Sequence, residues 1–108
     1  MKRAVFFLAL VAAFAPARAG SDQPRLIVVS DIGNEPDDSE SFVRLLLYTN
    51  QIEPRGFVAS TSTWQREAID PELFEERIAA YGAVLKALRT HDTAYPEANA
   101  LRALVKRG

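Results

Sequence analysis

The chain has 108 residues, with 13 basic and 14 acidic side chains, a formal net charge of −1 and no cysteine. The slight acidic excess argues against a nucleic-acid-binding surface, which normally shows a basic excess. Without cysteine the chain has no disulfides and no thiolate metal site, and its single histidine makes a zinc or iron site a poor fit.

Residues 1–19 have the three parts of a secretory signal peptide. Lys2 and Arg3 precede an apolar run over residues 4–15, and Ala-Arg-Ala ends the segment at Ala19. The run is shorter than the roughly 20 apolar residues that a transmembrane helix needs. We predict a secreted or periplasmic protein with no membrane association after cleavage. A short buried N-terminal helix fits the basic start and the Ala-x-Ala end poorly.

The first predicted strand is the aliphatic run Leu26–Val29. Its apolar residues do not alternate with polar ones, which is typical of a strand covered on both faces in a parallel sheet. Pro36 cannot lie inside a helix, but the residues behind it favour a helix start. We predict a helix over Asp38–Tyr48.

A second strand is predicted over Phe57–Thr61, and the hydroxyl-rich residues 60–63 after it indicate a polar pocket. Asp70 and Pro71 are typical of a helix N-cap and first position. Apolar residues at intervals of three and four then predict a helix that ends near Arg89.

A third helix is predicted at the end of the chain from Leu101, Leu104 and Val105. Strands that alternate with helices predict an α/β fold with a doubly wound parallel sheet. Two predicted strands are too few for such a sheet. We therefore expect residues 20–108 to be the N-terminal portion of a longer domain.

Four carboxylates follow the first predicted strand: Asp31, Glu35, Asp37 and Asp38. Ligands of open parallel sheets bind beyond the carboxyl ends of the strands, so this loop is a candidate site. Four acids this close repel one another unless a cation compensates, and oxygen ligands suit Ca²⁺ first and Mg²⁺ second. The alternative is that Asp37 and Asp38 only stabilise the start of a helix.

Other ligand-binding motifs are absent around this loop. Gly33 is its only glycine, so it has neither the three glycines of a dinucleotide-binding turn nor the Gly-Lys-Ser/Thr ending of a P-loop. The spacing of the acids also differs from that of an EF-hand loop.

These residues resemble a known family. The stretch SDIGNEPDDSESFVRLLLYTNQIEPRGFVASTSTW, followed by PELFEERIAAYGAVLKAL, is similar to the nucleoside-hydrolase-like domain of secreted bacterial proteins described as cellulose-binding. The resemblance covers residues 25–96. Its members are several times longer than this chain.

The resemblance to the nucleoside hydrolase signature implies separate roles for the acids. Asp31 matches the first aspartate, Asp37 the one that binds ribose hydroxyls, and Asp38 a calcium ligand. The second aspartate of the signature, which ligates calcium and activates water, corresponds to Gly33. Asn34 or Glu35 is then expected to supply replacement oxygens.

Two functions follow as hypotheses. In the first, the pocket acts on a ribosyl or glycosyl ligand, and Asp31 and Asp38 bind the metal. If the pocket hydrolyses an N-glycosidic bond, Asp31 and Glu35 are the catalytic residues. Asp37, Asn34 and Trp64 then bind the sugar. In the second, the protein binds cellulose or another carbohydrate without catalysis, and Trp64 stacks on a sugar ring. Trp64 could instead be a partly buried packing residue.

Overall fold

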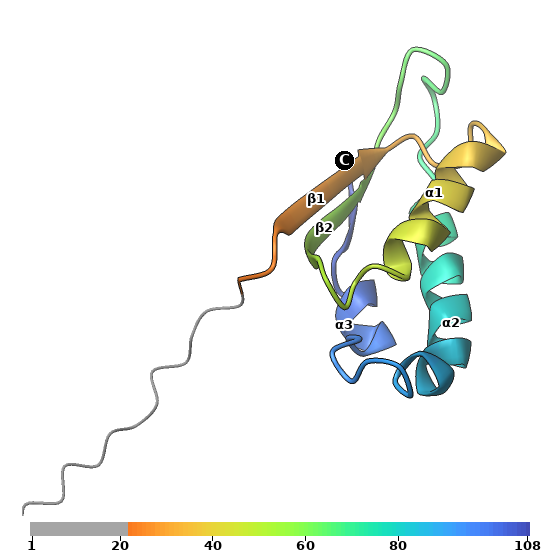
Figure 1. Cartoon of the computed structure of the whole chain (residues 1–108). Helices are drawn as coiled ribbons and strands as arrows, with labels where there is room; N and C mark the ends of the chain where they lie inside the picture. The colour runs from red at the N-terminus through yellow and green to blue at the C-terminus, as the bar shows by residue number, and fades with distance from the viewer. Residues whose placement is uncertain (1–21) are drawn as a thin grey trace, which may run out of the picture.

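The computed structural model describes residues 22–108 (Figure 1). The predicted signal peptide, residues 1–19, lies outside the described residues. The elements in chain order are β1 (Arg25–Ser30), α1 (Pro36–Leu46), β2 (Glu53–Ala59), α2 (Pro71–Leu88), α3 (Ala98–Arg102) and β3 (Val105–Arg107). None of the helices in residues 22–108 has the length and apolar character to cross a membrane.

The three strands form one parallel sheet in the order β1-β2-β3, which confirms the predicted α/β class. In the register of the sheet, Ser30 pairs with Ala59, and Ala59 pairs with Arg107. The carboxyl ends of all three strands therefore lie at the same edge. The loops that leave β1 and β2 meet there, and this is where the predicted site residues are found.

The third strand was not predicted. Leu101 lies in α3, as predicted, and is buried. However, α3 ends at Arg102 and Val105 belongs to β3, so the predicted helix is wrong at Leu104 and Val105. The amide of Phe57 donates a hydrogen bond to the carbonyl of Leu104 at 2.9 Å, and the amide of Gly108 donates one to the carbonyl of Ala59 at 2.8 Å. The otherwise unpaired edge of β2 thus draws this short segment into the sheet, which outweighs its weak helical pattern.

Two predicted boundaries also shift. Strand β2 begins at Glu53 and ends at Ala59, whereas Phe57–Thr61 was predicted. Pro54 suggested a turn because it lacks an amide hydrogen, but it lies at a register shift in the pairing with β1, where a missing donor is tolerated. Helix α1 begins at Pro36 because proline suits the first position of a helix.

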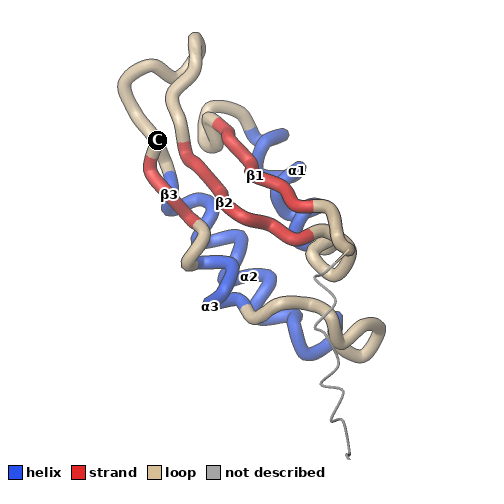
Figure 2. The backbone as a smooth tube through the Cα atoms, turned by 90° about the vertical axis from the view of Figure 1, so that its left-hand side faces the viewer, coloured by secondary structure: helices blue, strands red, loops and turns tan. Residues whose placement is uncertain are grey.

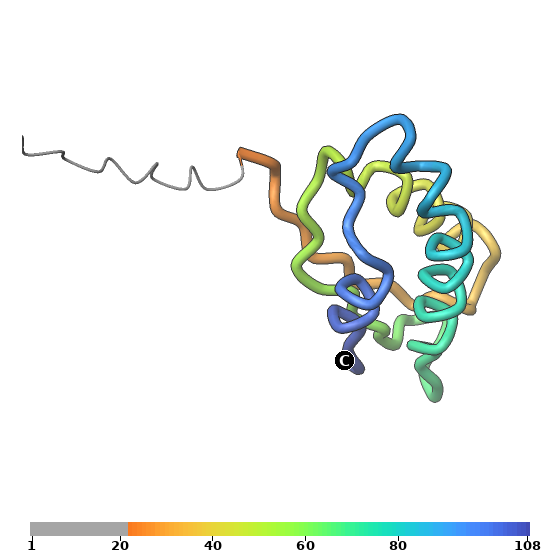
Figure 3. Tube along the Cα trace, turned by 90° about the horizontal axis from the view of Figure 1, so that it is seen from below, coloured from red at the N-terminus to blue at the C-terminus, as the bar shows by residue number. Residues whose placement is uncertain are grey.

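The helices all lie on one side of the sheet within the described residues. In Figure 2 the strands lie in front of the helices, and Figure 3 shows the strands and α2 on opposite sides of the molecule from below. Ile27 and Val29 of β1 are consequently 63% and 64% exposed. The prediction that β1 is covered on both faces is therefore wrong for residues 22–108.

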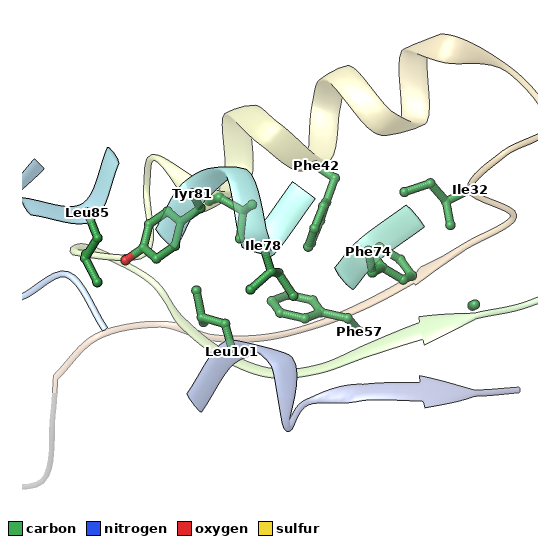
Figure 4. Packing of buried hydrophobic residues seen from close by; sticks show 10 residues of the cluster. Ile32, Phe42, Phe57, Phe74, Ile78, Tyr81, Leu85 and Leu101 are labelled. Atoms are coloured by element: carbon green, nitrogen blue, oxygen red, sulfur yellow. The ribbon is translucent and has the colours of Figure 1, made fainter. Parts of the chain in front are cut away.

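The core lies between α1, α2 and β2 and is centred on three phenylalanines (Figure 4). The ring of Phe42 meets those of Phe57 and Phe74 edge-on, with centroid distances of 4.9 and 4.6 Å. Ile32, in the loop between β1 and α1, packs into the same cluster and is 1% exposed. The loop that holds the acids is thereby fixed to the core by an apolar side chain.

At the other end of α1, Asp92 connects two loops. Its carboxylate accepts a hydrogen bond from the Asn50 side-chain amide at 2.9 Å and another from the backbone amide of Ala94, also at 2.9 Å. These two hydrogen bonds hold the pKa of Asp92 below its ordinary value of 3.8, and the bond from Ala94 has the larger effect. The charged form is therefore favoured in the folded state.

We expect Asp92→Asn to flatten the acid dependence of stability. Because the folded-state pKa of Asp92 is lowered, its contribution is complete above the unfolded-state pKa and is lost as the pH falls through the folded-state value. Urea denaturation between about pH 6 and about pH 3 should show a shallower slope of unfolding free energy in the variant. Glu67→Gln, which removes an exposed charge, is the control. Equal slopes in wild type and Asp92→Asn would contradict this role.

Candidate acidic binding site

Two carboxylates form the centre of the candidate site. Asp31 follows β1 directly, and Asp38 lies in the first turn of α1, within hydrogen-bonding reach of Asp31. Ser62 donates its hydroxyl to Oδ2 of Asp31 at 2.6 Å, and Ser30 donates to Oδ2 of Asp38 at 2.8 Å. Neighbouring carboxylates repel each other when both are ionised, so this pair favours a compensating cation.

Hydrogen bonding lowers the pKa of Asp31. The hydroxyl of Ser62 has the largest effect, and the side chain of Asp38 comes second, while partial desolvation opposes both. Asp31 is therefore ionised at neutral pH. It is available there as a cation ligand or as an acceptor for a hydroxyl group.

The predicted site residues line one hollow of about 180 Å³ at the carboxyl edge of the sheet. Its lining consists of Asp31, Asn34, Glu35, Asp37, Asp38 and Trp64. We call it the acidic hollow. The structure thus brings together the six residues predicted from the sequence to act in catalysis, sugar binding or metal binding, although their individual roles stay predictions. Trp64 is 83% exposed, so it is a rim residue rather than a buried packing residue.

The acids at the start of α1 do not cap the helix through their side chains. Glu35 is the N-cap residue, but it makes no side-chain capping bond. Within residues 22–108, neither Asp37 nor Asp38 accepts a hydrogen bond from a helix amide. The capping part of the alternative is therefore not supported, whereas its other part stands, because two acids in the first turn favour the helix dipole without a metal.

The donor set of the acidic hollow fits a hard cation only in part. All its charged donors are oxygens, which suits Ca²⁺ or Mg²⁺. Residues 22–108 nevertheless contain no group of three or more histidine, cysteine, aspartate or glutamate side chains placed to hold a metal ion. Asp31 and Asp38 therefore offer a pair of carboxylates, whereas calcium takes about six to eight oxygen ligands.

Gly33 has a backbone that requires glycine. Its φ of +107° lies in a region that residues with a side chain rarely adopt. A Cβ atom there would lie 2.6 Å from Oδ2 of Asp70 and 3.0 Å from Cδ1 of Leu73. A side chain at position 33 would thus meet the start of α2, and Gly33 is not among the residues that line the acidic hollow.

Sequence reasoning missed the residues that hold the site together. Ser30 and Ser62 each bond one of the paired carboxylates, and Ile32 fixes the loop to the core. The run of hydroxyls at residues 60–63 pointed toward a polar pocket but did not distinguish Ser62 from its neighbours. The contact between Ser62 and Asp31 joins residues far apart in the chain, so no local pattern reveals it.

A larger hollow, of about 400 Å³, opens near the amino ends of the strands. Its charged lining residues Glu53 and Arg55 form an ion pair with each other at 2.8 Å. None of the predicted site residues lines it. Its size alone is therefore a weaker indication of function than the convergence of acids at the opposite edge.

Comparison with known proteins agrees with the resemblance seen in the residues. Residues 25–108 match the family described as "Cellulose-binding Sde182, nucleoside hydrolase-like domain". The chain belongs to this family. A search of curated proteins found no match.

A solved structure has the same fold as this nucleoside hydrolase-like domain. It is a nucleoside hydrolase-related hypothetical protein from Saccharophagus degradans that is associated with carbohydrate metabolism. The TM-score is 0.73 at 23% sequence identity, with 80% of this chain covered. The chain spans 21% of the length of that protein. At this identity the likeness establishes the fold, and the chemistry has to be argued from the site.

Proposed function

We propose that the acidic hollow is a carbohydrate-binding site that takes a sugar unit of cellulose or a related saccharide. The observation that supports this most is that Asp31, Asn34, Glu35, Asp37, Asp38 and Trp64 line a single hollow. Carboxylates and an amide are suited to the hydroxyl groups of a sugar, and an exposed indole at the rim is suited to the apolar face of a sugar ring. Export by the predicted signal peptide, itself a proposal, would bring this site to extracellular polysaccharide.

Each lining residue has a proposed role. Asp37 and Asn34 bind sugar hydroxyls, since both line the acidic hollow and are exposed. Trp64 stacks on a sugar ring at the rim. Membership of a family described as cellulose-binding supports this choice of ligand.

We further propose that Asp31 and Asp38 bind a divalent cation, Ca²⁺ in the first place and Mg²⁺ in the second. The proximity of the two carboxylates supports this, and each has one oxygen held by a serine. A bound cation would supply positive charge for sugar hydroxyls and would lower the pKa of a coordinated water. Water and ligand hydroxyls would complete its coordination.

We expect Asp38→Ala to weaken calcium binding by at least about tenfold, because it removes one of two charged ligands. Isothermal titration calorimetry of the full chain with CaCl₂ measures this. Glu40→Ala is the matched control, because Glu40 is an exposed acid of the same helix that does not line the acidic hollow. Equal affinity in wild type and Asp38→Ala would exclude the pair as the cation site.

Trp64→Ala should reduce retention on cellulose by about tenfold if the indole stacks on sugar. A pull-down with microcrystalline cellulose measures the bound fraction. Tyr48→Ala is the control, since Tyr48 is a half-exposed aromatic residue just beyond the opposite end of α1. Retention that falls equally in both variants, or in neither, would contradict a site at Trp64.

Hydrolysis of a glycosyl bond is a second candidate function. The observation in its favour is that Asp31 is ionised at neutral pH, while Glu35 lines the same hollow and its side chain makes no hydrogen bond or ion pair within residues 22–108. Glu35 would accept a proton from the attacking water, the glycosyl bond would break, and the leaving group would take up a proton from solvent. Asp31 would hold the cation together with Asp38, and the cation would supply positive charge beside the ligand. Release of free base from nucleosides or of reducing sugar from cello-oligosaccharides, abolished by Glu35→Gln, would establish it. Retention on cellulose without turnover would leave binding as the function.

A further inference from the structure

The loop between β2 and α2 is joined to the acidic hollow by one short hydrogen bond, from Ser62 to Asp31. Among the hydrogen bonds that residues 61–67 make within residues 22–108, only the bond from Ser62 to Asp31 reaches the loop that holds the acids. The one other bond that leaves this segment for the start of α2 is the longer one, 3.4 Å, from the Gln65 side chain to Asp70. The length of the Ser62–Asp31 bond, 2.6 Å, is typical of a hydroxyl that donates to a charged carboxylate. In Figure 1 this loop extends beyond the carboxyl ends of the strands.

The same hydroxyl also determines the path of the chain at Trp64. The oxygen of Ser62 accepts hydrogen bonds from the backbone amides of Trp64 and Gln65, both at 3.0 Å. The Ser62 amide donates to the carbonyl of Gln65 at 2.9 Å, which closes a tight turn. One side chain therefore connects the carboxylate of the acidic hollow to the backbone that presents the indole.

We infer that Ser62 is a positioning residue that holds Trp64 over the acidic hollow. The indole and the hollow can then contact the same ligand, an oligosaccharide of at least two sugar units. This inference rests on the proposed carbohydrate-binding function. The indole is 83% exposed and is itself no part of the core, so its position depends on the turn at Ser62.

The size of the acidic hollow supports a ligand that extends beyond it. Its volume of about 180 Å³ is below the roughly 300 to 1,000 Å³ of pockets that enclose a drug-sized molecule. It suits one sugar ring. A ring stacked on the exposed indole at the rim is then a second unit, linked to the first.

The experiment compares wild type, Ser62→Ala and Ser62→Thr by calorimetry with glucose and with cellotetraose. Alanine removes both the donor to Asp31 and the acceptor for the two amides, whereas threonine retains a hydroxyl. Ser62→Ala should weaken cellotetraose binding by about tenfold and glucose binding by a clearly smaller factor, because only the larger ligand also contacts Trp64. Ser62→Thr should restore most of the loss. Thermal melts by circular dichroism verify that each variant is folded.

A second measurement follows Trp64 without any ligand. The chain has a single tryptophan, so the steady-state anisotropy of tryptophan emission reports on this loop alone. It should fall in Ser62→Ala and recover in Ser62→Thr.

Four results would overturn the inference. The first is unchanged anisotropy and unchanged cellotetraose affinity in Ser62→Ala. The second is an equal loss for glucose and cellotetraose, which would show that Ser62 acts on the acidic hollow and not through Trp64. The third is a wild type that binds neither sugar, which would exclude the oligosaccharide ligand together with the proposed function. The fourth is a wild type that binds both sugars with equal affinity, which would exclude the extended ligand alone.

Discussion

Gly33→Asp should lower the free energy of unfolding by about 2–4 kcal/mol and should not create hydrolytic activity. The substitution restores the aspartate that the nucleoside hydrolase signature has at this position. However, Gly33 has a φ of +107°, and its Cβ would lie 2.6 Å from a carboxylate oxygen of Asp70. The new side chain would thus combine backbone strain, a steric clash and like-charge repulsion.

Urea denaturation of four variants separates these contributions. Gly33→Ala retains the backbone strain and the clash without the charge, and Asp70→Ala removes the group that Gly33 faces. The double variant Gly33→Ala/Asp70→Ala should lose less stability than the summed losses of the two single variants, because the clash between position 33 and the Asp70 side chain is gone. Additive losses would show that Asp70 does not restrict position 33. A stable Gly33→Asp variant that hydrolyses nucleosides would show that the loop can adopt the hydrolase geometry.

Ile32→Ala should lower the free energy of unfolding by about 2–5 kcal/mol, a large fraction of the roughly 5–15 kcal/mol of a typical domain. Ile32 is 1% exposed and lies between Asp31 and Gly33 in the chain, so its removal leaves a cavity directly beneath the acidic loop. We also expect the folded variant to bind saccharide more weakly, because the loop loses its contact with the core. Urea denaturation and calorimetry with cellotetraose measure the two effects.

Two controls separate stability from binding. Ile32→Val should cost only about 0.5–1.5 kcal/mol and retain saccharide affinity. Leu85→Ala removes a buried side chain near the opposite end of α2, so it should destabilise the fold without changing the affinity of the folded protein. If Ile32→Ala were to change affinity no more than Leu85→Ala, the apolar anchor would be irrelevant to the site.

The elements that local patterns could predict are those with long, regular signals. The aliphatic run at β1 and the apolar stripe of α2 predicted both elements to within a few residues. The short strand β3 has no such signal, because its conformation is decided by the unpaired edge of β2. The exposure of Ile27 and Val29 was equally inaccessible, since it depends on which face the helices cover.

The residues of the acidic hollow were predictable because most of them belong to one loop at the end of a strand. Asp31, Asn34, Glu35, Asp37 and Asp38 all lie in or directly beside the β1–α1 connection. What the sequence could not show is the contribution of distant segments. Ser62 reaches Asp31 across 31 residues, and Asp70 approaches Gly33 from the start of α2. Both contacts exist only after the sheet has brought the two loops to one edge.

Titration of the full chain with cellotetraose, followed by tryptophan emission, tests the proposed site most directly. The single tryptophan, Trp64, lines the acidic hollow, so its emission is a local probe of ligand at the rim. We predict a saturable change in emission, and an apparent affinity at least about tenfold weaker in Asp37→Ala. Retention of the protein on cellulose with no change in Trp64 emission, or identical titrations of wild type and Asp37→Ala, would contradict the assignment of this hollow as the carbohydrate site.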